Sequence, residues 1–274
     1  MKIALAQTNP TVGDLAGNAA LIRRFIGRAR QAGARLVVFP ELALMGYPPR
    51  DLLMKGGLVE ANLAALESLA AETRGIAAIV GYVDRNDSPV GRPLFNALAL
   101  LDGGRIAARK YKTLLPTYDV FDEARYFEPG PSAVVVEVDG VRLGLSICED
   151  IWNPDDPAMR HLYPEDPIAA IAARRPDAIV NISASPYVMG KYDARLGLLR
   201  RQAQAHGTCV LYCNQVGGND ELIFDGASLA LSADGSLLAQ CCDFDEDMAL
   251  VDVPARGIAS ADPRAAAPGD DAAA

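Results

Sequence analysis

The sequence predicts an α/β fold in which two similar halves build a four-layer α-β-β-α sandwich. Short apolar runs of strand length alternate with amphipathic segments of helical spacing along most of the chain. The second half repeats the order of the first, and 50% of the 274 residues are hydrophobic, enough for a substantial core. Two sheets packed face to face, with the helices outside, would satisfy both the alternation and the repeat.

The first half is expected to contain three strands, two helices and a hairpin. Its strands should span 2–7, 35–41 and 76–83, and its helices 17–33 and 58–73. The run RLVVFPE at 35–41 is almost continuously apolar, as in a buried strand. The stretch 94–112 places an Asp-Gly-Gly turn between two apolar runs, which is typical of a β-hairpin.

The second half follows the same plan. Its strands should span 140–148, 176–185 and 208–216, its helices 164–175 and 192–207, and its hairpin 224–240. Two parallels support the repeat, because ARLVVFPE resembles PDAIVNIS, and FNALALLDGGRI resembles FDGASLALSADGSL. The alternative interpretation is that the two halves are not a true repeat, since any α/β protein alternates strands and helices in this way.

A change in composition divides the chain near residue 254. After the apolar segment MALVDVP the sequence becomes rich in Ala, Pro and Asp and loses its apolar periodicity. We therefore expect one domain over 1–254, followed by a linker or disordered tail over 255–274.

Charge and cysteine content exclude several classes of protein. A net charge of −9 argues against binding to nucleic acid or to an anionic membrane, and no apolar run has the roughly 20 residues of a membrane helix. Five cysteines, an odd number without a CxxC pair, and two histidines far apart make a disulfide framework or a metal site improbable. We expect a reduced, cytoplasmic protein.

Three reactive side chains each follow an apolar strand, at the position where α/β proteins place their sites. Glu41 follows VVFP and should be poorly solvated, which suits a general base. Lys112 lies in the mostly apolar YKTLLP, and Cys148 ends GVRLGLSIC and enters a turn. Each alone has an ordinary interpretation, as a loop carboxylate, a solvated lysine or a buried structural cysteine.

The two acids that follow Cys148 sharpen this hypothesis. The negative charges of Glu149 and Asp150 would disfavour a thiolate, so a nucleophilic Cys148 needs a cation and a base from elsewhere. Lys112 would supply the cation and Glu41 the base, and no histidine would be required.

These residues lie in segments that resemble one known family. The Glu-Lys-Cys set is similar to that of the nitrilase, or carbon–nitrogen hydrolase, superfamily. Five segments are closer still to the glutamine amidase domain of glutamine-dependent NAD synthetases, a resemblance that covers residues 1 to about 253. The segments are VVFPELALMGYPPRDLL, KTLLPTYDVFDEARYF, SICEDIWNP, NISASPY and VGGNDELIFDGAS.

The resemblance implies a nitrilase-like sandwich and a role for each matching residue. It implies Cys148 as nucleophile, Glu41 as base, Lys112 as stabiliser of the oxyanion and Glu123 as an additional buried glutamate near the site. Residues that match positions holding the glutamine substrate are Tyr118, Glu149, Ser185 and Lys191. It also implies homo-oligomers, and the chemistry would need no metal or organic cofactor.

One feature of the resembling proteins is missing from this sequence. Their ATP-dependent synthetase part carries an S-G-G-x-D-S loop, which this chain lacks. We therefore expect a glutamine amidohydrolase that passes ammonia to a separate or fused NAD synthetase, without binding ATP itself. The alternatives are a stand-alone hydrolase of another small amide or nitrile, and a non-catalytic subunit.

Overall fold

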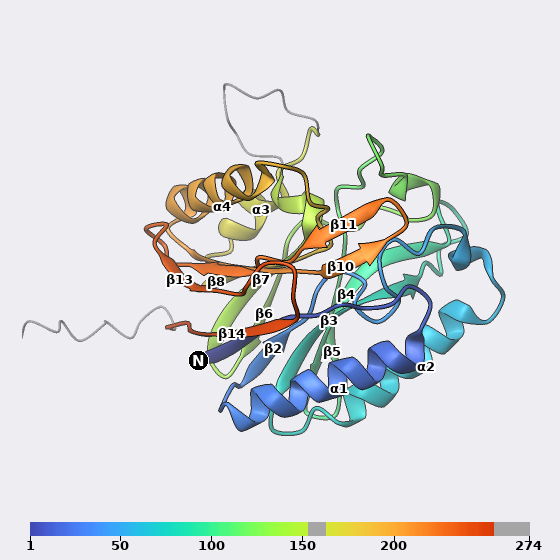
Figure 1. Ribbon diagram of the computed structural model, residues 1–274, viewed down its shortest axis with the longest axis horizontal. Helices are drawn as coiled ribbons and strands as arrows, with labels where there is room; N and C mark the ends of the chain where they lie inside the picture. The colour runs from blue at the N-terminus through green and yellow to red at the C-terminus, as the bar shows by residue number, and fades with distance from the viewer. Residues whose placement is uncertain (153–162, 255–274) are drawn as a thin grey trace, which may run out of the picture.

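The computed structural model describes residues 1–152 and 163–254, so the predicted tail at 255–274 lies outside the described residues. Two six-stranded sheets stack face to face (Figure 1). The first sheet contains, in spatial order, β14 (Asp247–Asp252), β1 (Lys2–Gln7), β2 (Leu36–Val38), β3 (Ala77–Arg85), β4 (Leu94–Asp102) and β5 (Arg105–Tyr111). The second contains β13 (Leu237–Gln240), β12 (Leu229–Leu231), β9 (Cys209–Asn214), β8 (Ala178–Ser183), β7 (Val141–Ile147) and β6 (Val134–Val138).

The two sheets have the same internal plan, which confirms the repeat predicted from the sequence. In each, three neighbouring strands run parallel, β1-β2-β3 in the first and β7-β8-β9 in the second. An antiparallel hairpin follows, β4–β5 or β12–β13. A single antiparallel strand, β14 or β6, completes the opposite edge.

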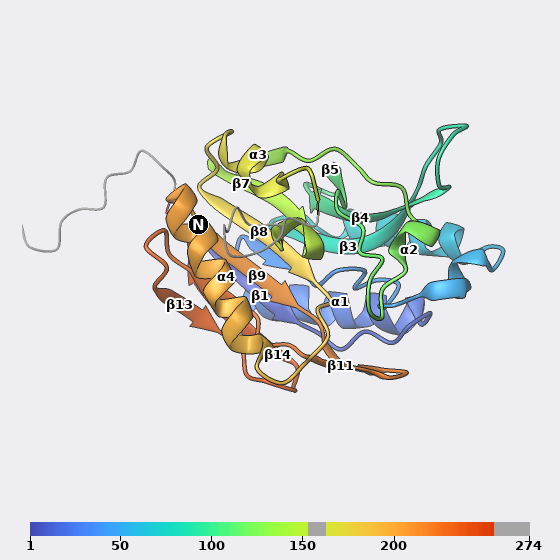
Figure 2. The same ribbon diagram turned by 90° about the horizontal axis from the view of Figure 1, so that it is seen from above.

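Helices cover the outer face of each sheet. The first sheet is covered by α1 (Leu15–Gln31) and α2 (Leu58–Ala71), and the second by α3 (Pro167–Ala172) and α4 (Lys191–His206). Figure 1 shows the two pairs on opposite sides of the strands, and Figure 2 shows α3 and α4 over the second sheet. The predicted four-layer α-β-β-α sandwich is therefore confirmed.

Strand alternation explains how one chain fills three apolar layers. Within β1, Leu5 packs between the sheets, whereas Ala6 faces the α1–α2 layer. Leu36 and Val37 divide in the same way on β2. Successive side chains of a strand point to opposite faces, so continuously apolar strands can serve both layers at once.

Some predicted boundaries were wrong. The strand expected at 35–41 ends at Val38, so Glu41 lies three residues beyond its strand. The hairpin β10 (Val216–Asn219)–β11 (Leu222–Asp225) takes the first two residues of the hairpin predicted at 224–240. Neither β6 nor β14 was predicted, and β14 pairs with β1 from the other end of the chain.

Three short 3₁₀ helices complete the described fold, and two of them carry predicted site residues. They are η1 (Arg50–Met54), η2 (Glu123–Arg125) and η3 (Cys148–Ile151). Within residues 1–152 and 163–254, no helix combines the length and the apolar character that crossing a bilayer requires.

Candidate active site

A buried cluster of charges joins three of the predicted residues. The Lys112 ammonium donates to Oε1 of Glu41 and to Oε1 of Glu123, each at 2.8 Å. All three side chains are almost fully buried. Asn96, on β4, donates from Nδ2 to Glu41 at 2.7 Å and to Glu123 at 3.3 Å. One cation therefore bridges two carboxylates, and an amide holds both from the sheet.

Two local features bring Glu41 into this cluster. The segment after β2 turns against β3 at Gly81, where an added Cβ would collide with the backbone of Pro40 and Leu42. Glycine at this position therefore lets the turn approach the sheet closely. The other Glu41 oxygen, Oε2, accepts from the backbone N–H of Ala184 at 2.9 Å, just after β8. The carboxylate is thus held by both halves of the sandwich.

Cys148 occupies a strained backbone position at the end of β7. Its φ is +42°, a left-handed conformation that is uncommon outside glycine. The chain turns from strand to η3 at this residue, as in other turns that present a nucleophile. Strain of this kind persists only where the surrounding structure holds it, and it is frequent at active sites.

The environment of the Cys148 thiol favours its protonated form. Burial raises the pKa of Cys148 well above its usual value, and the negative charges of Glu41 and Glu149 add to this effect. The Lys112 ammonium opposes it. The charges of Glu41, Glu149 and Lys112 all affect the thiol, which couples Cys148 electrostatically to the Glu41–Lys112 cluster. The resting group is a thiol that must lose a proton when it attacks.

The two acids after Cys148 have different surroundings. Oδ1 of Asp150 accepts from the backbone N–H groups of Thr113 and Leu114 at 2.9 Å each, and Oδ2 accepts from that of Ile147 at 3.1 Å. Backbone N–H groups therefore hold both oxygens of the Asp150 carboxylate. Glu149 instead accepts from the hydroxyls of Tyr118 at 2.9 Å and Tyr163 at 3.0 Å.

Glu149 lies close enough to the cluster for its charge to matter. Burial raises the pKa of Glu149, while the Lys112 ammonium and the hydrogen bonds from Tyr118 and Tyr163 oppose that rise. Its charge also raises the pKa of Cys148. The charge of Glu149 therefore affects the thiol, whereas Asp150 is held by backbone N–H groups.

The remaining predicted residues lie after β8. Lys191, at the start of α4, donates to the carbonyl of Pro186 at 2.9 Å, and its Nζ lies 5.6 Å from the centre of the Trp152 ring. Burial lowers the pKa of Lys191, and a negative charge on Cys148 would oppose that change. Ser185 is buried and donates its backbone N–H to Asn214 at 2.9 Å.

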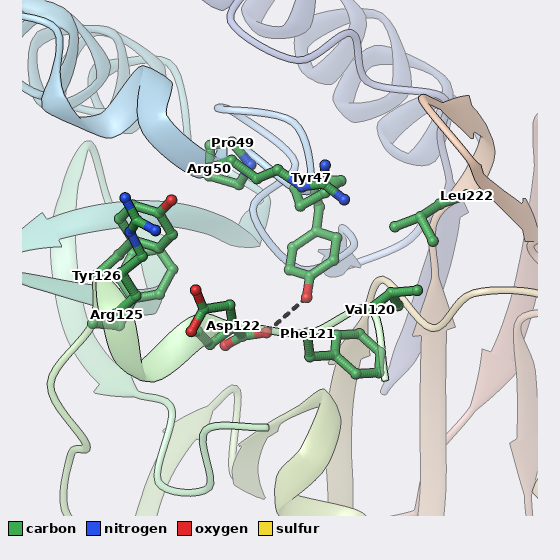
Figure 3. A pocket seen from close by; sticks show the side chains of 12 residues that line it. Tyr47, Pro49, Arg50, Val120, Phe121, Asp122, Arg125, Tyr126 and Leu222 are labelled. Atoms are coloured by element: carbon green, nitrogen blue, oxygen red, sulfur yellow. Dashed lines mark hydrogen bonds between the residues drawn. The ribbon is translucent and has the colours of Figure 1, made fainter. Parts of the chain in front are cut away.

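A cavity of about 280 Å³ adjoins the charged cluster. Its lining includes Tyr47, Arg50, Phe121 and Glu123, but not Cys148. Figure 3 shows Tyr47 projecting toward the segment that carries Phe121, where its hydroxyl donates to Oε1 of Glu123 at 2.8 Å. Glu123 therefore contacts both the lysine cluster and this cavity.

Burial in the cluster makes Glu123 a weaker acid than an ordinary glutamate. Desolvation raises the pKa of Glu123 to about 7, against the lowering effect of Lys112 and with a further rise from the Glu41 charge. The Lys112 pKa lies well above its usual value, because the two carboxylates outweigh the lowering effect of burial. The lysine therefore stays charged, whereas Glu123 gains or loses its proton near neutral pH.

The described residues offer no metal site of the usual kind. Within 1–152 and 163–254, no three His, Cys, Asp or Glu side chains gather as metal ligands would. The carboxylates of Glu41 and Glu123 are bridged by Lys112 instead. None of the five cysteines, which all lie within the described residues, forms a disulfide, and Cys209 and Cys213 lie on β9 as predicted.

Sequence reasoning missed several residues of the cluster. Asn96 lies in the apolar run LFNALALL, and a polar residue inside a buried strand is a signal that could have identified it. Lys110 lies two residues before Lys112 and is also fully buried. The contacts of Tyr47 and Tyr163 depend on loops whose approach no local pattern predicts.

Comparison with known protein families gives a match over almost the whole chain. The carbon-nitrogen hydrolase family profile matches residues 2–262. The glutamine-dependent NAD(+) synthetase of Thermotoga maritima is 37% identical over 255 residues, and that of Synechocystis sp. is 40% identical over 253. These alignments cover 92% and 91% of this chain but only 42% and 45% of the two relatives.

Solved structures give the same result. The glutamine-dependent NAD+ synthetase of Acinetobacter baumannii superposes with a TM-score of 0.82 at 32% identity, over 91% of this chain and 44% of that protein. An amidase from Nesterenkonia sp., solved with acrylamide added to its active-site cysteine, has a TM-score of 0.77 at 28% identity. That alignment covers 93% of this chain and 94% of the amidase. The chain therefore belongs to the carbon–nitrogen hydrolase family.

Proposed function

We propose that residues 1–254 hydrolyse the side-chain amide of glutamine, with Cys148 as the nucleophile. One observation carries this proposal: a buried ammonium bridges two carboxylates, and its charge acts on the buried thiol of Cys148. Such a cluster contains a nucleophile, a base and a cation for a developing oxyanion, which are the three groups that acyl transfer needs.

The reaction begins with attack on the glutamine carbonyl. Sγ of Cys148 bonds to the carbonyl carbon as Glu41 takes the thiol proton. The ammonium of Lys112, together with a backbone N–H such as that of Glu149, stabilises the oxyanion. Glu41 then gives its proton to the amide nitrogen, the C–N bond breaks, and ammonia leaves a thioester on Cys148.

The second half of the reaction releases glutamate. Glu41 removes a proton from water, and the resulting hydroxide attacks the thioester carbonyl. The tetrahedral intermediate collapses, the C–S bond breaks, and the proton returns to sulfur. The two-step route fits a thiol that rests in its protonated form, because the same carboxylate serves as base in each step.

Charge complementarity supports glutamine as the substrate. Its α-ammonium would pair with Glu149, whose carboxylate is oriented by Tyr118 and Tyr163. Its α-carboxylate would pair with Lys191, which donates to the carbonyl of Pro186, the residue after Ser185. A neutral amide without these two charges would lose both contacts.

We also propose that the ammonia serves an ATP-dependent NAD synthetase. The chain spans less than half the length of the synthetases it matches, so the acceptor activity would belong to another domain or subunit. Direct transfer would protect ammonia from protonation and dilution. A synthetase partner would then raise the rate of glutamine hydrolysis by ordering loops around the site.

Ammonia release from a set of amides tests the proposed function. Glutamine, asparagine, acetamide and a small nitrile would be compared, with and without a synthetase, deamido-NAD and ATP. We expect glutamine to be preferred and the complete mixture to accelerate its hydrolysis. Preference for another amide or nitrile would identify a stand-alone hydrolase, and no hydrolysis in any mixture would identify a non-catalytic subunit.

The pH dependence of the reaction should reflect Glu123. We expect hydrolysis to fall as the pH drops below about 7, because protonation of Glu123 removes one of the two carboxylates that hold the Lys112 ammonium. Glu123→Gln should lose this dependence near pH 7, because the group that takes up the proton is gone. Rate profiles of the variant and of the control Glu221→Gln, an exposed surface carboxylate, measure this loss.

Glu123 also affects the pH dependence of stability. Its effect is opposite to that of a surface carboxyl group whose pKa is lowered by folding. The Glu123 pKa is higher in the folded chain than its usual 4.5, so folding favours the protonated form. Its contribution is present below pH 4.5 and is lost as the pH rises through about 7. If the rate of hydrolysis by Glu123→Gln falls with pH in the same way as that of the wild type, Glu123 is not the group that titrates.

A further inference from the structure

A second buried lysine lies beside the candidate active site and has no role in the proposed mechanism. Lys110 is about 1% exposed, and its Nζ lies 3.4 Å from Oδ2 of Asp150, which is equally buried. The same ammonium donates to Oγ1 of Thr113 at 2.7 Å and to the carbonyl of Pro131 at 2.9 Å. It therefore holds Asp150 and the loop after Lys112 at the same time.

Asp150 connects the two segments that carry Lys112 and Cys148. Its Oδ1 binds the N–H groups of Thr113 and Leu114, the two residues after Lys112. Its Oδ2 binds the N–H of Ile147, the residue before Cys148. One carboxylate thus fixes the first half of the sandwich to the second, next to both reactive groups.

We propose that Lys110 and Asp150 are a positioning pair that sets the Lys112 ammonium against the Cys148 sulfur. This inference rests on the proposed function, because it assigns a purpose to that geometry. Neither residue touches the reacting atoms in the mechanism above. They act through the backbone on either side of Lys112 and Cys148.

The energetics of burial favour this interpretation over simple stabilisation. Taking two charges out of water is costly, and well-packed apolar residues often replace such a pair without loss of stability. The pair does, however, fix one register between two segments. A displacement of about 1 Å between catalytic groups can cost about 100-fold in rate, so register matters most at this position.

Lys110→Met tests the proposal, because it keeps the length of the side chain and removes its charge. We expect kcat per titratable Cys148 thiol to fall about 10- to 100-fold, with KM for glutamine nearly unchanged. The matched control is Arg35→Met, which breaks the exposed Arg35–Asp139 pair between the same two halves. That pair lies away from the reactive groups, so the control should keep its kcat.

A second measurement does not depend on glutamine turnover. The rate of alkylation of Cys148 by iodoacetamide should fall at least about fivefold in Lys110→Met, because the Lys112 ammonium no longer sits against the sulfur. Lys110→Arg should restore part of both rates. If the wild-type chain ignores glutamine but shows this alkylation pattern, the proposed function fails while the positioning pair stands.

The double variant Lys110→Met/Asp150→Asn covers the case in which Lys110→Met does not fold. It leaves no buried charge without a partner, and the Asn oxygen can still accept from Thr113 and Leu114. We expect it to fold and to show the same loss of kcat and alkylation rate. A folded single or double variant with wild-type kcat and alkylation rate would overturn the proposal.

Discussion

Replacing Cys148 with alanine is expected to lower amide hydrolysis by about 10⁴-fold or more while the chain stays folded. The thiol is the group that forms the covalent bond in the proposed reaction, and no neighbouring side chain can replace it. Alanine has the same Cβ as cysteine, so the strained backbone at φ +42° gains no new clash. The loss of one buried sulfur should cost about 1 kcal/mol of unfolding free energy. Ammonia release and thermal unfolding measure the two effects.

The control for this substitution is a second buried cysteine. The Sγ of Cys213 lies in the layer between the sheets, 3.2 Å from the carbonyl of Val38, and has no part in the proposed chemistry. Cys213→Ala should lose stability but keep its rate per folded molecule. Full activity in folded Cys148→Ala would show that another group carries the reaction.

Replacing Lys112 with methionine should affect both catalysis and stability. The rate should fall about 10²- to 10³-fold, because the oxyanion loses its cation. The unfolding free energy at alkaline pH should fall by about 3 kcal/mol, because Glu41 and Glu123 are left as buried carboxylates without their shared ammonium. Chemical unfolding over a range of pH measures the second effect.

The pH dependence of that variant separates its two defects. As the pH falls, the buried Glu123 takes up a proton, so the stability deficit should shrink. Lys112→Met/Glu123→Gln should recover part of the stability at alkaline pH but none of the rate. A single variant as stable as the wild type at every pH would contradict the buried bridge, and an unchanged rate would exclude Lys112 from the chemistry.

The sequence predicted the fold because its apolar strands and helical spacing were strong enough to define two halves. It indicated candidate site residues because α/β proteins place reactive side chains after strand ends. Glu41 follows β2 in the first half, and Cys148 follows β7 in the second. The apolar surroundings of Lys112 correctly indicated burial.

The parts that escaped prediction depend on contacts between distant segments. Asn96 bridges Glu41 and Glu123 across the sheet, and β14 pairs with β1 at the opposite end of the chain. The burial of Lys110 could have been predicted, because residues two apart on a strand share a face and Lys112 was already predicted to be buried. The different surroundings of Glu149 and Asp150 depend on the turn that begins at Cys148, which strand periodicity cannot define.

Cys148 attacks glutamine in the proposed reaction, and a reactive glutamine analogue tests this role. The chain would be treated with a diazoketone analogue of glutamine, and its peptides would be mapped by mass spectrometry. We expect a single adduct on Cys148, which excess glutamine prevents from forming. An adduct confined to Cys241 or Cys242, with Cys148 unmodified in a folded chain, would contradict it.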